Sequence, residues 1–185
     1  VSVKALLFLH CNEGDEMENI ELKARIPDLD KARQVCEKLS AQFIWRRNQR
    51  DIYFSTKPSK RLKLRIEDNE SPYLVLYDRP DECGGRNCTY SLLTIHRTCH
   101  AESVTFFTNA LEVRGEVSKT RELFMWENVR IHLDRVEGLG KFIEFEHPVG
   151  EHSAQDAAQR VQYLCDEFSV AEENTVAGSY IDQVV

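Results

Sequence analysis

Residues 20–25, written IELKAR, alternate strictly between an apolar and a charged side chain. Because successive side chains of a strand point to opposite faces, this period of two predicts a half-buried β-strand. The same alternation recurs in RLKLRIE at 61–67 and in VRIHLD at 129–134, and Glu144 and Glu146 share one side of KFIEFE at 141–146. The pattern therefore predicts several strands that each have one apolar face and one charged face.

Helical stripes and turn residues divide the rest of the chain. Apolar residues spaced three and four apart predict helices over 29–40, 101–113 and 153–168, the first capped by Asp28 and the last by Ser153. The turn formers DNES lie between the strand patterns at 61–68 and 72–80, so these two strands are expected to pair as a hairpin. The expected strands are 18–26, 43–55, 61–68, 72–80, 89–97, 116–126, 128–136 and 141–146.

About eight strands with mostly short connections favour an α+β fold. We expect an antiparallel sheet that curls into a closed β-barrel, or tunnel, with the helices packed outside it. No repeat, low-complexity tract or Pro/Gly-rich linker divides the chain, so we expect one domain over 17–185 after a disordered or loosely ordered extension at 1–16. The apolar run at 5–9 is too short for a membrane span, and no secretory signal pattern accompanies it, so a cytoplasmic location is expected.

Charge and cysteine content narrow the possible functions. The formal net charge is −7, which argues against general binding to nucleic acid or to anionic membranes. It leaves 24 Lys and Arg residues available to form a local basic cavity. No CxxC pair exists, and the Cys and His residues between 83 and 100 match no common zinc-site spacing. Unpaired thiols are therefore the favoured interpretation of the cysteines.

The charged strand faces are rich in Lys and Arg. For one strand alone, a solvent-exposed face is the simpler interpretation. Repetition of the pattern favours inward-facing charges, which would line a hydrophilic tunnel and repel one another unless a polyanion bound there. Carboxylates beside this lining would favour Mg²⁺ or Mn²⁺, because these cations take oxygen ligands and commonly bridge to phosphates. The residues therefore point to a metal-bound linear triphosphate.

Seven segments also resemble, in order along the chain, the CYTH superfamily of triphosphate tunnel metalloenzymes. That superfamily includes class IV adenylyl cyclases, thiamine triphosphatases and inorganic tripolyphosphatases. The stretch LDRVEGLGKFIEFE is most similar to the class IV adenylyl cyclase-like branch. The segments are NIELKARI, QRDIYF, RLKLRIE, LVLYDRPD, KTRELF, VRIHLDRVEGLGKFIEFE and SYIDQV.

The resemblance implies a role for each residue that matches the family pattern. Lys23, Lys63 and Tyr53 would have catalytic roles, positional or acid–base. Lys and Arg suit phosphate binding because their charge persists at neutral pH and because Arg can donate to two oxygens at once. The implied metal ligands are Glu21, Asp134, Glu144 and Glu146. The implied substrate-binding residues are Lys23, Lys63, Arg65, Arg79, Lys119, Arg121 and Arg130.

The chain departs from the family signature ExExK at one position, because Asn19 replaces the first Glu. The resemblance implies a metal-dependent enzyme that acts on ATP, tripolyphosphate or thiamine triphosphate by phosphoryl or nucleotidyl transfer. A triphosphate hydrolase and a non-catalytic triphosphate- or polyphosphate-binding module remain open alternatives. Asn19 favours the binding module, whereas the pair Glu144 and Glu146 counts against it. We expect a monomer or homodimer that binds neither nucleic acid nor membranes.

Overall fold

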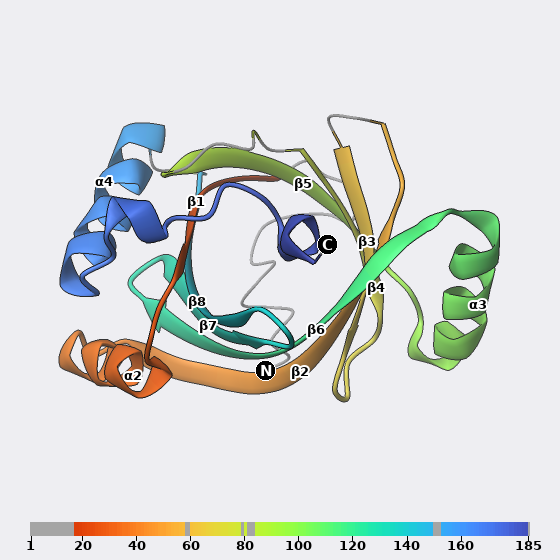
Figure 1. Ribbon diagram of the computed structural model, residues 1–185, viewed down its shortest axis with the longest axis horizontal. Helices are drawn as coiled ribbons and strands as arrows, with labels where there is room; N and C mark the ends of the chain where they lie inside the picture. Colours follow the sequence, from red (N-terminus) through yellow and green to blue (C-terminus); the bar gives the residue numbers. More distant parts are fainter. Residues whose placement is uncertain (1–16, 58–59, 79, 81–83, 150–152, 185) are drawn as a thin grey trace.

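The computed structural model describes residues 17–57, 60–78, 80, 84–149 and 153–184. Within these residues, eight antiparallel strands form a closed barrel in the order β1-β5-β4-β3-β2-β6-β7-β8 (Figure 1). The predicted α+β barrel is therefore confirmed, while the expected extension at 1–16 lies outside the described residues. The strands are β1 (Met17–Arg25), β2 (Gln42–Phe54), β3 (Lys60–Glu67), β4 (Tyr73–Asp78), β5 (Arg86–Thr94), β6 (Val113–Trp126), β7 (Val129–Val136) and β8 (Gly140–Pro148).

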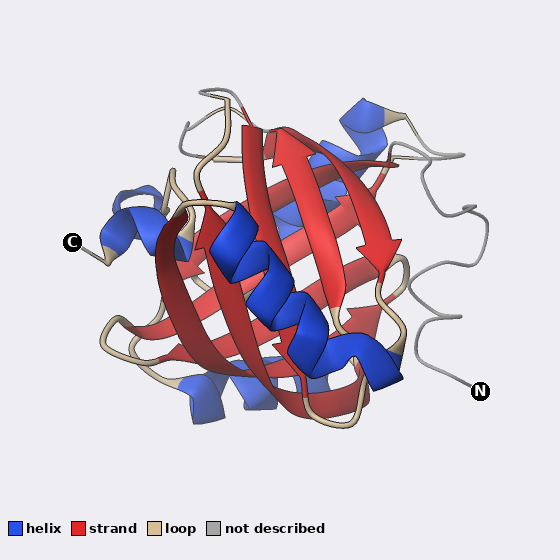
Figure 2. Ribbon diagram, turned by 90° about the vertical axis from the view of Figure 1, so that its right-hand side faces the viewer, coloured by secondary structure: helices blue, strands red, loops and turns tan. Residues whose placement is uncertain are grey.

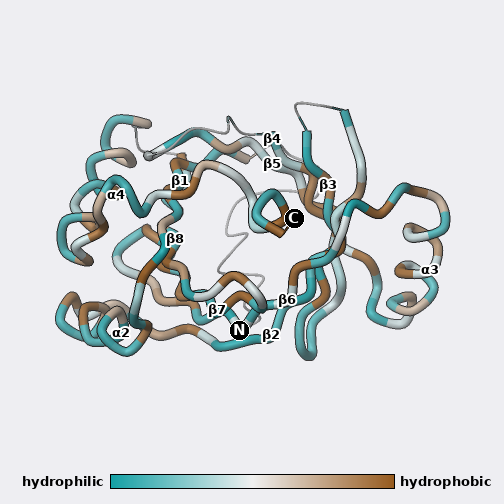
Figure 3. Tube along the Cα trace, in the orientation of Figure 1, coloured by the Kyte–Doolittle hydropathy of each residue, from teal (hydrophilic) through white to brown (hydrophobic). Residues whose placement is uncertain are grey.

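The alternation in the sequence becomes the two faces of the barrel wall. In β1, Ile20, Leu22 and Ala24 belong to the core outside the barrel, whereas Glu21 and Lys23 line its interior. Figure 3 shows the resulting mixture of hydrophilic and hydrophobic residues along the strands. Both faces of β1 are buried, because helices cover its outer face and the barrel encloses its inner one.

Three α-helices pack against the outside of the barrel: α2 (Leu29–Lys38), α3 (His100–Ala110) and α4 (Ala154–Glu167). Helices α2 and α4 cover the apolar face of β1, β7 and β8, and α3 lies over another part of the wall (Figures 1 and 2). The predicted caps are present: the Asp28 carboxylate accepts a hydrogen bond from the Asp30 amide at 2.8 Å, and the Ser153 hydroxyl accepts one from the Asp156 amide at 3.1 Å. No helix in the described part of the chain is long and apolar enough to span a bilayer.

Some element boundaries differ from those expected. The helix predicted over 101–113 ends at Ala110, because the chain becomes extended at Leu111 and enters β6 at Val113. Strand β5 begins at Arg86, three residues earlier than predicted, because it pairs with β1 from that residue on. The hairpin of β3 and β4 is present as predicted.

The C-terminal segment closes one end of the barrel lumen. It contains the 3₁₀ helices η2 (Glu172–Asn174) and η3 (Tyr180–Gln183), and its end lies within the ring of strands in Figure 1. The Tyr180 and Phe142 rings meet edge to face at 4.9 Å between centroids, within an apolar cluster that also contains Tyr53. Gly115 on β6 permits the close approach of Ile181 in the C-terminal segment, because a Cβ atom at position 115 would lie 2.8 Å from the Ile181 side chain.

Candidate active site

The barrel encloses a cavity of about 150 Å³, lined by side chains from all eight strands and from the C-terminal segment. Ten of the residues that the sequence analysis singled out line this cavity, although they come from six different strands. Arg79 lies outside the described residues. The ten are Glu21, Lys23, Tyr53, Lys63, Arg65, Lys119, Arg121, Arg130, Glu144 and Glu146.

Three carboxylates from adjacent strands converge at one point of the lumen. Glu21 and Glu146 are direct cross-strand partners on β1 and β8, and Glu144 lies two residues away on the same face. One oxygen of each carboxylate lies within 4.8 Å of the others. Such a cluster of buried anionic oxygens fits a hard divalent cation. Among the described residues, no group that includes Cys or His has comparable geometry.

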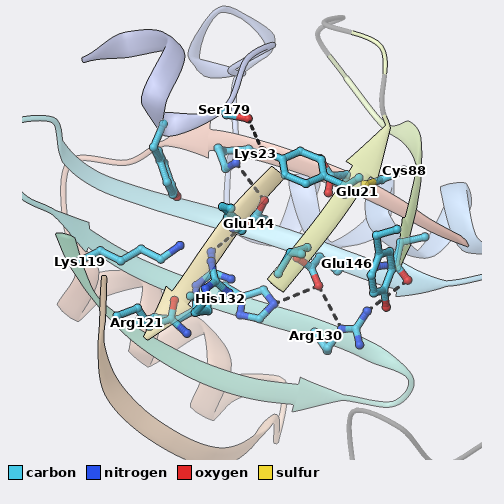
Figure 4. Close-up of a pocket in the computed structure, with 18 of the residues that line it drawn as sticks. Glu21, Lys23, Cys88, Lys119, Arg121, Arg130, His132, Glu144, Glu146 and Ser179 are labelled. Atoms are coloured by element: carbon cyan, nitrogen blue, oxygen red, sulfur yellow. Dashed lines mark hydrogen bonds and ion pairs between the residues drawn. The ribbon is translucent and has the colours of Figure 1, made fainter. Parts of the chain in front are cut away.

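Basic residues contact Glu144 and Glu146 (Figure 4). The Lys23 ammonium lies 3.0 Å from Glu144, and the Arg130 guanidinium lies 3.1 Å from Glu146. Burial alone would raise the pKa of Glu144, but Lys23 and Arg121 outweigh burial and hold that pKa well below its usual range. Glu144 is therefore ionised at neutral pH and available to a cation.

Asp134 lies near the three-carboxylate group, because the Arg121 guanidinium contacts both Asp134 and Glu144. It is fully buried, and its two oxygens accept hydrogen bonds from Arg121 at 2.7 and 2.6 Å. The Tyr180 hydroxyl donates to it at 2.7 Å. Asp134 is not part of the three-carboxylate group. These contacts position Arg121 and the C-terminal segment, and metal ligation by Asp134 stays a prediction.

Asp51 is a lumen residue that the sequence analysis did not single out. It is fully buried on β2 and accepts hydrogen bonds from Lys63 at 2.9 Å and from Arg65 at 2.6 Å. The signal was present in the sequence, because Asp51 has the same parity as Tyr53 in the predicted strand. The expectation that the empty basic lining would repel itself was therefore wrong: carboxylates inside the wall offset much of its positive charge.

Arg86 is a second lumen residue outside the expected set, and it joins Glu21 to the C-terminal segment. Its Nε donates to Glu21 at 3.2 Å, while its Nη1 donates to the carbonyl oxygens of Val176 at 3.1 Å and Ala177 at 2.5 Å. Because one guanidinium bridges these groups, the orientation of a candidate metal ligand depends on the docked C-terminal segment.

Lys63 is a basic lumen residue whose pKa is lowered toward neutrality. Burial and the neighbouring Arg65 lower its pKa to about 8, although Asp51 opposes the shift. Lys63 is the direct cross-strand partner of Tyr53, and its Nζ lies 5.6 Å from the centre of the Tyr53 ring. The amine can therefore exchange a proton at physiological pH.

ATP affinity is expected to fall as pH rises above about 8, because Lys63 then loses its charge. The terminal phosphate of ATP, with a second pKa of about 6, is already ionised in this range and does not contribute to the change. Titration calorimetry between pH 7 and 9.5 measures the effect. The control is Lys63→Arg, which keeps its charge and should flatten the profile. An identical decline in both proteins would contradict the assignment to Lys63.

A family comparison agrees with this geometry. Residues 17–180 match the family model described as the CYTH domain. The chain belongs to the CYTH domain family. A Methanocaldococcus jannaschii protein named "Putative adenylate cyclase" is 24% identical over 172 residues, which cover 90% of this chain and 98% of that protein.

Solved structures show the same CYTH fold at low sequence identity. The PH1012 protein of Pyrococcus horikoshii superposes with a TM-score of 0.77 and 22% identity, and the match covers 89% of this chain and 98% of that one. A Hippeastrum protein, described as a "putative adenylyl cyclase" with a dominant triphosphatase activity, has a TM-score of 0.61 and 17% identity. That match covers 88% of this chain and 91% of the Hippeastrum chain.

Asn19 stands where the CYTH signature has its first Glu, and it faces the lumen. Its side chain is buried and its Oδ1 accepts a hydrogen bond from Arg130 at 3.2 Å. We expect Asn19→Glu to tighten Mg²⁺ or Mn²⁺ binding by roughly tenfold, because the number of charged ligands sets the affinity of such sites. Metal titration by calorimetry tests this, with Asn48→Glu, on an exposed part of β2, as the matched control. Equal metal affinity in Asn19→Glu and the wild type would show that this position does not contribute to the metal site.

Proposed function

We propose that this CYTH-domain chain is a divalent-metal-dependent enzyme that binds a linear triphosphate inside the barrel and acts on it by phosphoryl or nucleotidyl transfer. One observation carries the proposal: three mutually close carboxylates share a cavity with a set of Lys and Arg side chains. A triphosphate needs many cationic donors, and the transfer of its groups needs alignment and charge neutralisation rather than covalent help from the protein.

The basic lining would bind and orient the phosphate chain. Arg121 donates from Nε and Nη2 to Asp134, and this contact fixes the plane of its guanidinium. Arg65 is held by Asp51 in the same manner, and Lys119 forms an ion pair with Asp134 at 3.5 Å. Side chains fixed in this way lose little further freedom when a ligand binds, so the cavity is preorganised for a polyanion.

The carboxylates Glu21, Glu144 and Glu146 would hold Mg²⁺ or Mn²⁺. When bound, such an ion supplies charge stabilisation to phosphate oxygens. Lys23 and Arg121 hold Glu144 ionised, and His132 and Arg130 outweigh burial and lower the pKa of Glu146. These contacts keep the carboxylates in their anionic, ligating form at neutral pH.

Lys63 and Tyr53 would serve proton transfer in either reaction. Lys63, with a pKa of about 8, can accept or return a proton near neutral pH, and Tyr53 lies directly across the strand pair from it. A base in this position suits activation of water. The cyclase reaction would use the same cavity, with a ribose 3′-hydroxyl directed at the α-phosphorus instead of water at a terminal phosphorus. The names of the relatives include both activities.

The products distinguish these reactions. The protein is incubated with ATP, tripolyphosphate or thiamine triphosphate and with Mg²⁺ or Mn²⁺, and phosphate, pyrophosphate and cyclic AMP are quantified. Pyrophosphate with cyclic AMP would support the cyclase, and phosphate release would support the hydrolase. Thermal stabilisation by tripolyphosphate without turnover would support a binding module and would overturn the enzymatic proposal. A protein that neither binds nor turns over any of these triphosphates would overturn the proposal as a whole.

A further inference from the structure

The His132 imidazole lies beside the three-carboxylate group, and the proposed reaction does not use it. It comes from β7, where it pairs directly with Glu144 on β8 and lies diagonally across from Glu146. His132 is only 4% exposed and lines the barrel cavity. In Figure 4 its ring points toward Glu146. A buried imidazole next to two candidate metal ligands needs a physical explanation.

The two carboxylates on β8 differ in how their oxygens are contacted. Each oxygen of Glu144 contacts a different basic side chain, at 3.0 and 2.5 Å. Both contacts of Glu146 instead involve Oε2, which lies 3.1 Å from Arg130 Nε and 3.3 Å from His132 Nε2. Among the described residues, Glu146 Oε1 has no ion pair or hydrogen bond. Glu146 therefore keeps one oxygen for a cation, while protein donors face the other.

The donors that face Glu146 Oε2 are close to it but poorly aligned with it. Arg130 Nε and both ring nitrogens of His132 are buried, and none of them makes a hydrogen bond within the described part of the chain. The 3.3 Å between His132 Nε2 and Oε2 is at the upper end of hydrogen-bond distances, so the alignment is what is missing. Unpaired buried polar groups are costly. Their presence at one carboxylate points to a pairing that becomes complete when the cavity is occupied.

The chemistry of this pair assigns the direction of the contact. A carboxylate can only accept hydrogen bonds, so the ring nitrogen that faces Glu146 acts as the donor. Arg130 is shared, because its Nη2 also donates to Asn19 at 3.2 Å, whereas within the described residues His132 contacts Glu146 alone. Outer donors of this kind fix the orientation of a ligating side chain, and their removal typically costs roughly 10–100-fold in metal affinity.

We propose that His132 is a positioning residue of the candidate metal site, which donates from Nε2 to Glu146 Oε2 and so directs the other oxygen of Glu146 toward a divalent cation. This inference rests on the proposed function, because it requires the carboxylates to bind a metal. A role in which the imidazole contacts only the phosphate chain predicts a different set of affinities.

Metal binding in the absence of any triphosphate tests this role. Mn²⁺ is titrated by calorimetry into the wild type, His132→Leu and His132→Gln. The leucine removes the donor and should weaken Mn²⁺ binding by about 10–100-fold. The glutamine carries an N–H donor at the end of its side chain and should restore the affinity to within about threefold of the wild type. His100→Leu, at an exposed position on α3, is the matched control and should bind Mn²⁺ as the wild type does.

Tripolyphosphate binding in EDTA separates metal positioning from a structural role or a phosphate contact. The basic lining is unchanged in both His132 variants, so each should bind tripolyphosphate within about twofold of the wild type. This result would also show that the variants fold.

Three results would overturn the inference and leave the proposed function standing. The first is a Mn²⁺ affinity of His132→Leu within about twofold of the wild type, which is below the usual effect of an outer donor. The second is an equal loss in the leucine and glutamine variants, and the third is a parallel loss of Mn²⁺ and tripolyphosphate affinity in His132→Leu. Failure of the wild type to bind Mn²⁺ would instead overturn the metal dependence of the proposed function, and this inference with it.

Discussion

Replacing Glu146 by glutamine is expected to lower metal-dependent turnover by about 100-fold or more, because even the outer partners of metal ligands contribute 10–100-fold. The substitution keeps the size of the side chain and its ability to accept from Arg130, but it removes one of the three converging negative charges. Turnover is measured over a range of Mg²⁺ and Mn²⁺ concentrations. A higher metal requirement, in addition to the lower maximal rate, would indicate that the loss arises at the metal.

The matched control for this substitution is Glu116→Gln. Glu116 lies on β6 and pairs with Arg50 on the exposed outer face of the barrel, so the same chemical change there leaves the lumen untouched. We expect its turnover and metal requirement to equal those of the wild type. If Glu146→Gln retained turnover within about threefold of the control, the three carboxylates would not form the reactive centre.

The alternation of side chains made much of this site predictable. Because the period of a strand is two, assigning Glu21 and Lys23 to the polar face of β1 also assigned the apolar residues between them to the core. The same reasoning applied to Glu144 and Glu146 on β8, and all four residues line the lumen. The face to which a strand residue points depends only on its position in the local alternation, so a single sequence suffices to predict it.

The pairing of charges could not be predicted, because it depends on strand order and on the C-terminal segment. Asp51 meets Arg65 across a strand pair, whereas Arg86 meets Glu21 only because β5 lies beside β1. Asp134 has the parity of a lumen residue, yet Arg121 and Tyr180 take up its oxygens. Tyr180 arrives from the far end of the chain, and no local pattern indicates its position.

The balance of charge in the lumen has a functional consequence. Cations that are already paired with buried carboxylates hold their geometry without a ligand, so the unoccupied barrel does not have to expand to relieve repulsion. A triphosphate then adds contacts to side chains that are already ordered. This arrangement also makes the fold depend on the buried carboxylates, because the loss of one would leave cations unpaired in the interior.

Asp51→Ala is expected to lower the free energy of unfolding by about 3–5 kcal/mol, because it leaves Lys63 and Arg65 without their buried counter-ion. Urea unfolding at pH 7 measures this loss. The triple variant Asp51→Ala, Lys63→Met, Arg65→Met should recover most of it, since it removes the charges together. A loss below about 1 kcal/mol in the single variant would show that the pairing contributes little.

The pH dependence of unfolding separates the charge of Asp51 from its packing. Burial raises the pKa of Asp51, but Arg65 and Lys63 outweigh burial and hold it well below its usual range. A lowered carboxyl pKa gives stability that is fully present above the unfolded value, about 3.9, and is lost as pH falls through the folded value. Asp51→Asn, which keeps the shape, should therefore be less stable than the wild type at pH 7, and the difference should shrink as pH falls below about 4. A difference that stays constant from pH 7 to pH 3 would assign the effect to packing, because Asp51 is the titratable group in which the two proteins differ.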